Sequence, residues 1–250
     1  MDATNGRGLM NHDVPSRRLL EAQAAWLAPA RARLLRRANI ARRRRVLDLA
    51  CADGTVVEEL VRRSGGDVAA LDRSRDALTD RPEKFRGATV VRGDAERLPF
   101  ADGAFDLVFC QFALMWLDVS AVVDEIRRVL TPGGALAAIE PDYGGMIEHP
   151  PEIALGGLWQ AALKRAGADP CVGRKLPALL ADAGFEVRVD LLDRLEPPSP
   201  LRFDLLGELP LSAAERAALD RARRADASLG EGPRVAHLPM FLVTAEMSHL

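Results

Sequence analysis

Cysteine, aromatic residues and long apolar runs are all scarce in this chain of 250 residues. Three cysteines, Cys51, Cys110 and Cys171, are too few for a disulfide framework and lack the paired spacing of a zinc site, so reduced structural thiols and no metal are expected. No apolar run approaches the ~20 residues that cross a bilayer, and the N-terminus has no secretory signal. We therefore expect a cytoplasmic protein that does not bind membranes.

An excess of charge of one sign is also missing. A formal net charge of −2 argues against a protein that neutralises a polyphosphate backbone, so nucleic acid is not an expected partner. The basic cluster Arg31–Arg37, continued at Arg42–Arg45, could bind phosphate or form a solvated helix face, and we favour the solvated face. The composition, 48% hydrophobic and 28% charged, is typical of a soluble domain with one core.

Short apolar runs alternate with small-residue turns and amphipathic stretches, which predicts successive βα units around a parallel sheet. Strands are expected near Arg45–Ala50, Asp67–Leu71, Thr89–Arg92, Phe105–Cys110, Ala135–Glu140, Glu186–Leu192 and Pro239–Ala245. Helices are expected over 17–38, bent or restarted at Pro29, over Ser212–Ala225, and from starts near Thr55, Ser74, Asp118 and Gly173. The run from Thr131 to Gly134 should separate a helix from the fifth strand.

These elements predict an α/β fold, with a Rossmann-like, mostly parallel sheet of seven strands, helices on both faces and a helical cap. Residues 1–40 are expected to form an N-terminal helical cap segment. Residues 41–250 would form the main domain, with cap insertions near 145–170 and 195–237.

The first predicted strand runs directly into a turn of small residues, from Ala50 to Gly54, and then into a helix. In a doubly wound sheet this turn lies at the carboxyl edge of the strands, where a nucleotide-like ligand meets free N–H groups of the helix. Asp72 ends the second strand about twenty residues further on, where an acidic side chain can accept hydrogen bonds from both ribose hydroxyls.

A third element follows, with Gly93-Asp94-Ala95, then Leu98-Pro99-Phe100, and then Phe105-Asp106-Leu107-Val108. Together with the first turn, Asp72 and the Pro-Gly-Gly run, it resembles class I S-adenosylmethionine-dependent methyltransferases of the small-molecule branch. The resemblance covers roughly Arg45 to Glu140.

The resemblance implies S-adenosylmethionine as cofactor, S-adenosylhomocysteine as product, and a set of cofactor contacts. It implies that the first turn lies beneath the methionine and ribose, that Asp72 holds the ribose, that the third element surrounds the adenine, and that the fourth strand ends beside the sulfonium. The residues so assigned are Asp48, Ala50, Ala52, Gly54, Asp72, Arg73, Asp94, Ala95, Leu98 and Gln111.

Ala50 and Ala52 stand where the family pattern most often has glycine. If either position needs a left-handed backbone, the turn is strained by on the order of 1 kcal/mol or more. A nicotinamide-dependent oxidoreductase on a similar sheet is another hypothesis. Its pyrophosphate would need the pattern G-x-G-x-x-G, however, and this turn offers only one glycine.

A base is needed only if the acceptor must lose a proton, and Tyr143, His149 and Glu140 follow the fifth strand as candidates. Each has a structural alternative: Tyr143 could pack as an aromatic, His149 could occupy a surface turn, and Glu140 could accept backbone N–H groups. His12, in the N-terminal segment, is a further, weaker candidate.

Phe112, Trp116 and Trp159 could line an acceptor pocket or belong to the core, and Arg174 could bind an acceptor carboxylate or be solvated. We therefore expect a methyltransferase for a small molecule of secondary metabolism, either monomeric or homodimeric. The alternative, motivated by Ala50 and Ala52, is a relative that binds the cofactor without methyl transfer or catalyses another reaction.

Overall fold

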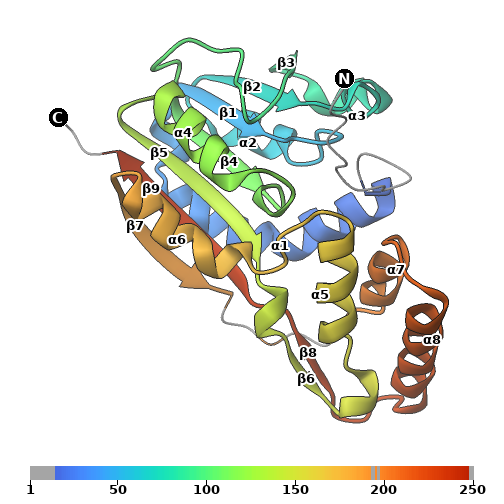
Figure 1. Ribbon diagram of the computed structural model, residues 1–250. Coiled ribbons are helices and arrows are strands. Elements are labelled where there is room, and N and C mark those ends of the chain that lie inside the picture. Colours follow the sequence, from blue (N-terminus) through green and yellow to red (C-terminus); the bar gives the residue numbers. More distant parts are fainter. Residues whose placement is uncertain (1–14, 193–194, 196–197, 248–250) are drawn as a thin grey trace, which may run out of the picture.

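The computed structural model describes residues 15–192, 195 and 198–247. Its main feature is a seven-stranded sheet with the order β3-β2-β1-β4-β5-β9-β7 (Figure 1). Strand β9 runs antiparallel to the other six strands, which are parallel to one another. The strands are β1 (Arg45–Leu49), β2 (Asp67–Asp72), β3 (Ala88–Arg92), β4 (Phe105–Gln111), β5 (Leu130–Pro141), β7 (Phe185–Leu191) and β9 (Met240–Met247). The predicted fold class is confirmed.

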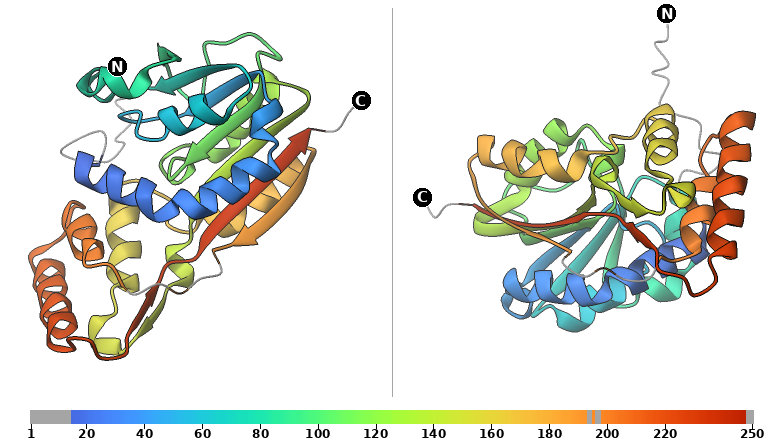
Figure 2. Two further views of the ribbon diagram at one scale, coloured as in Figure 1. Left: turned by 180° about the vertical axis from the view of Figure 1, so that it is seen from behind. Right: turned by 90° about the horizontal axis from the view of Figure 1, so that it is seen from below.

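Helices cover both faces of this sheet because its central strands are apolar on both sides (Figure 2). On β4, Leu107 and Phe109 pack on one face, and Val108 and Cys110 pack on the other. Helices α1 (Arg17–Arg37) and α2 (Val57–Arg63) cover the first face, α4 (Val119–Val129) and α6 (Val172–Asp182) cover the second, and α3 (Arg75–Asp80) packs against β2 and β3.

Helix starts agree with the sequence where a capping side chain defines them. Ser74 accepts a hydrogen bond from the N–H of Ala77 before α3, and Asp118 accepts one from Ala121 before α4. Helix α1 continues through Pro29 instead of restarting there. The Pro-Gly-Gly run follows the end of α4 as expected, but it already lies inside β5, which begins at Leu130.

A small second layer lies at the carboxyl end of β5 (Figure 1). It consists of a two-stranded antiparallel sheet, β6 (Ile147–His149) with β8 (Val235–His237), and of helices α5 (Gly156–Arg165), α7 (Leu201–Gly207) and α8 (Ala213–Ser228). Helix α8 begins after Ser212, close to its predicted start, and Ser212 and Glu215 form a complete capping box there. The sequence did not predict α7 or the β6–β8 pair.

Candidate functional site

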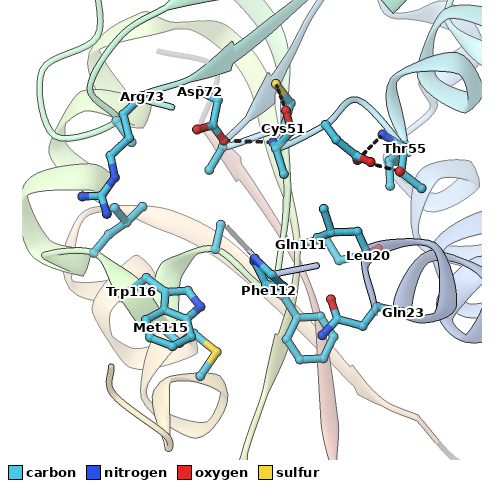
Figure 3. A pocket seen from close by; sticks show the side chains of 18 of the residues that line it. Leu20, Gln23, Cys51, Thr55, Asp72, Arg73, Gln111, Phe112, Met115 and Trp116 are labelled. Carbon is cyan, nitrogen blue, oxygen red and sulfur yellow. Dashed lines mark hydrogen bonds between the residues drawn. The ribbon is translucent and has the colours of Figure 1, made fainter. Parts of the chain in front are cut away.

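A cavity of about 940 Å³ opens where the carboxyl ends of β1, β2 and β4 meet α1 and the second layer (Figure 3). One end of it, the acidic end, is lined by Asp48, Asp53, Asp72 and Asp94. The other end, the aromatic end, is lined by Phe112, Trp116, Tyr143 and Trp159, together with Leu163, Leu205 and Leu209. The volume lies at the upper end of the range for ligand pockets.

The turn after β1 has a left-handed backbone at the two alanines. The φ angle is 55° at Ala50 and 49° at Ala52, and both residues line the cavity. Gly54 is also left-handed, with a φ of 77°, but it lies outside the cavity lining. A Cβ atom there would come within 2.8 Å of the ring of Phe85, so this glycine is needed for packing. The anticipated strain therefore falls on both alanines.

Asp72 connects the ends of β1 and β2. Its Oδ2 accepts a hydrogen bond of 2.9 Å from the N–H of Ala52, and its Oδ1 accepts one of 2.8 Å from the N–H of Ser74. A carboxylate has about four acceptor positions, so two stay available at the cavity wall. Asp72 can therefore hold the turn and accept from ligand hydroxyls at the same time.

Asp48 is a buried carboxyl at the acidic end, and its Oδ2 has no hydrogen-bond partner among the described residues. Burial raises its pKa to about 8, and the charge of Asp72 adds to this, whereas the nearby Arg31 opposes the shift. An unpaired carboxyl oxygen beside a cavity favours a cationic donor. The residues present thus fit the ammonium and sulfonium groups of S-adenosylmethionine and would repel a pyrophosphate.

Most of the third motif also lies at the acidic end. Arg73, Asp94 and Ala95 line the cavity. Leu98 is a correction: it is absent from the lining and packs in the core, and its N–H donates to Oε2 of Glu125 at 2.6 Å.

Arg31 overturns the expectation that the whole basic cluster is solvated, because its side chain is only 5% exposed. Its Nε and Nη2 both bind Oε2 of Glu59, at 2.8 and 2.7 Å, and its Nη1 donates to Oε1 of Gln111 at 3.1 Å. The position was detectable in the sequence, since Arg31 shares a helix face with the apolar Leu27 and Leu35.

The aromatic end begins where β4 ends. The rings of Tyr143 and Trp159 stack with centroids 4.9 Å apart and planes at 30°, and Phe112 and Trp116 also line this end. Burial raises the pKa of Tyr143 well above its usual range, so its hydroxyl stays protonated. Sequence reasoning missed several lining residues that come from distant elements, namely Leu20, Gln23, Leu205, Glu208 and Leu209.

Glu140 and His149 lie outside the cavity lining. Glu140 is fully buried, and its Oε1 accepts N–H hydrogen bonds of 3.0 Å from both Ala113 and Leu114, which is the structural alternative considered above. Burial raises its pKa to about 7. His149 is exposed on β6, in the second layer. His12 lies outside the described residues.

Arg174 is likewise not part of the cavity. It lies in the first turn of α6, and its Nε binds Oδ2 of Asp142 at 2.5 Å, which holds the turn after β5. Arg174 therefore does not line the cavity as a residue of the acceptor pocket would, and its guanidinium has a carboxylate partner within the protein.

Within the described ranges, no group of three His, Cys, Asp or Glu residues is placed to hold a metal ion. Cys51 and Cys110 are buried free thiols, and Cys171 is a half-buried one. No helix in the same ranges has the length and hydropathy to span a membrane.

Comparison with known proteins gives a consistent result. A family profile described as a methyltransferase domain matches residues 47–138. An uncharacterized methyltransferase of Synechocystis is 34% identical over 57% of this chain and 67% of its own length. Demethylmenaquinone methyltransferase of Thermus thermophilus is 32% identical over 60% of this chain and 77% of its own length. The matched region spans 61% of two further relatives.

A solved structure of a methyltransferase candidate from Bacillus halodurans has the same fold, with a TM-score of 0.62 and 20% identity, covering 87% of this chain and 98% of the other. The chain thus belongs to the class I S-adenosylmethionine-dependent methyltransferases. Its cofactor is S-adenosylmethionine, which supplies an activated methyl group when bound.

Proposed function

We propose that this protein transfers the methyl group to a small-molecule acceptor that binds at the aromatic end of the cavity, in secondary metabolism. The observation that carries the proposal is one continuous cavity with an acidic end at the β1–β2 edge and an aromatic end beneath α5 and α7. The two expected cap insertions, near 145–170 and 195–237, would form the acceptor side, and Trp159 and Leu205 from them support this division.

At the acidic end, we assign Asp48 to the ammonium group of the cofactor and Asp72 to its ribose hydroxyls. Asp94 and Ala95 would bind the adenine, with Arg73 beside it. The turn with Ala50 and Ala52 would lie beneath the ribose and methionine. In this arrangement the end of β4 carries Gln111 to the point where both ligands meet.

Transfer from a sulfonium to a nucleophile in line with it depends mostly on alignment of the two reactants. Tyr143 is the one of the three base candidates that lines the cavity, and as a protonated phenol it would donate a hydrogen bond to the acceptor instead of removing a proton. Glu140 would act indirectly, because it fixes the backbone of the loop that carries Phe112 and Trp116.

A second candidate function is cofactor binding without methyl transfer. The left-handed Ala50 and Ala52 favour it, since each adds a methyl group where backbone approaches the ligand. Release of S-adenosylhomocysteine in the presence of any acceptor would exclude this candidate.

The test is calorimetric titration with S-adenosylmethionine and S-adenosylhomocysteine, with NADH as the control ligand. Micromolar binding of the two sulfur compounds, and none of NADH, is expected. It would be followed by a screen of acceptors for S-adenosylhomocysteine release. Failure of both sulfur compounds to bind would show that the alanines close the site, and would contradict the proposed function.

A further inference from the structure

The side-chain amide of Gln111 has a fixed orientation. A guanidinium carries only donors, so the Gln111 atom that lies 3.1 Å from Nη1 of Arg31 is the amide oxygen. Arg31 is itself held by two contacts to Glu59 and by a hydrogen bond of 3.0 Å from Nη1 to the carbonyl of Ala24. Rotation of the amide by 180° would place its NH₂ group against the guanidinium, which costs a hydrogen bond and sets donor against donor.

As a consequence, the NH₂ group of Gln111 is left for a ligand. Its Nε2 has no hydrogen-bond partner among the residues that the structure describes. This nitrogen is also not one of the fully buried polar atoms that lack a partner, so it is accessible. Gln111 lines the cavity together with Asp72 and Phe112, which belong to its two ends (Figure 3). This side chain therefore offers N–H donors to a molecule bound at the junction of the two ends.

The aromatic end offers no counterion for an anionic acceptor. Within the described lining the basic residues are Arg73 and Arg92, and both lie near the ends of β2 and β3 at the acidic end. Glu208, which directly follows α7, also lines the cavity, and its negative charge would repel a carboxylate or a phosphate. An anion without a partner is expensive to bury, whereas the rings of Tyr143 and Trp159, stacked on each other, add aromatic surface to the cavity wall.

We propose, on the basis of the function proposed above, that the acceptor is an uncharged, planar ring compound with a hydroxyl or carbonyl oxygen. That oxygen accepts a hydrogen bond from Nε2 of Gln111, and the ring packs against the wall formed by Tyr143 and Trp159. Arg31 acts as a positioning residue, because it determines which side of the Gln111 amide the acceptor meets.

The test uses the full chain saturated with S-adenosylhomocysteine and two probes at pH 7, 2-naphthol and 3-hydroxy-2-naphthoate, which differ by a carboxylate. Calorimetry is expected to show binding of 2-naphthol, and binding of the carboxylate probe at least about tenfold weaker. Gln111→Met removes the NH₂ donors at nearly the same length without adding an acceptor, and should weaken 2-naphthol about tenfold. Gln160→Met, the same change on α5 outside the lining, should leave it unchanged.

The affinity for S-adenosylhomocysteine is measured first, on the unmodified protein and on each variant, and separates the two proposals. If the unmodified protein does not bind this compound, the proposed function is contradicted and not this inference. Equal affinities for the two probes, no binding of 2-naphthol, or an unchanged affinity in Gln111→Met would each overturn the inference. If Gln111→Met does not show a cooperative thermal transition, Gln111→Leu removes the same donors and carries the same expectation.

Discussion

Replacement of Ala52 with glycine should stabilise this protein, although glycine usually destabilises. Ala52 has a φ of 49° in a turn that the hydrogen bond to Asp72 keeps in place. A left-handed backbone costs an L-residue about 1–2 kcal/mol, and glycine loses about 0.5–1 kcal/mol more backbone entropy on folding than alanine does. The difference leaves a net gain of about 0.5–1 kcal/mol for Ala52→Gly.

For a chain of 250 residues, 1 kcal/mol shifts the midpoint of thermal unfolding by about 2–4 °C, so Ala52→Gly should raise it by about 1–4 °C. Ala217→Gly is the matched control, because Ala217 is exposed in the interior of α8. The control should lower the free energy of unfolding by about 1 kcal/mol. Scanning calorimetry should therefore show a higher midpoint of thermal unfolding for Ala52→Gly and a lower one for Ala217→Gly.

The same change removes a methyl group from the cavity wall, so the affinity for S-adenosylhomocysteine should stay equal or increase. A melting temperature that falls in Ala52→Gly as much as in Ala217→Gly would refute the idea of strain at this turn. A weaker affinity for the cofactor product would refute the idea that the methyl group crowds the ligand.

Three further changes test the site. Asp72→Ala leaves two backbone N–H groups and the ligand without an acceptor, so calorimetry should show an affinity for S-adenosylhomocysteine lower by about 1–3 kcal/mol. Asp48, whose pKa of about 8 exceeds its ordinary 3.8, binds more protons in the folded than in the unfolded state. Its contribution to the free energy of unfolding should fall as pH rises from 6 to 8, by at most about 1.4 kcal/mol per pH unit. Because Glu140, with a pKa of about 7, adds a similar contribution below pH 7, Asp48→Asn should flatten the dependence most clearly between pH 7 and 8 in urea titrations. Arg31→Ala should lower unfolding free energy by about 3 kcal/mol, against less than about 0.5 kcal/mol for the exposed Arg36→Ala; equal effects would contradict the buried role.

The sequence predicted the main sheet well because its signals are local. Each strand is an apolar run bounded by a turn, and the side chains of Ser74 and Asp118 define helix starts within a few residues. It could not predict the β6–β8 pair, since Ile147 and His237 are far apart in the chain and each strand is three residues long. Such short strands acquire their conformation from the partner, not from their own composition.

For the site, motifs predicted which turns line the cavity but not every side chain that faces it. Leu98 lies in a recognised motif and points into the core, whereas Arg31 lies in an apparently solvated run and contacts Gln111. Both outcomes depend on the neighbours that packing provides, Glu125 in one case and Glu59 in the other. Residue spacing alone carries no information about those neighbours.

The turn after β1 joins strain and binding in a way that the motif does not reveal. A strained backbone persists only where surrounding contacts determine it, and here the N–H of Cys51 binds the carbonyl of Leu71 at 3.0 Å while the N–H of Ala52 binds Asp72. Both partners belong to the end of β2. The strand that we assign to the ribose therefore also holds the turn that carries the two alanines, and the carboxylate of Asp72 binds this turn directly at Ala52.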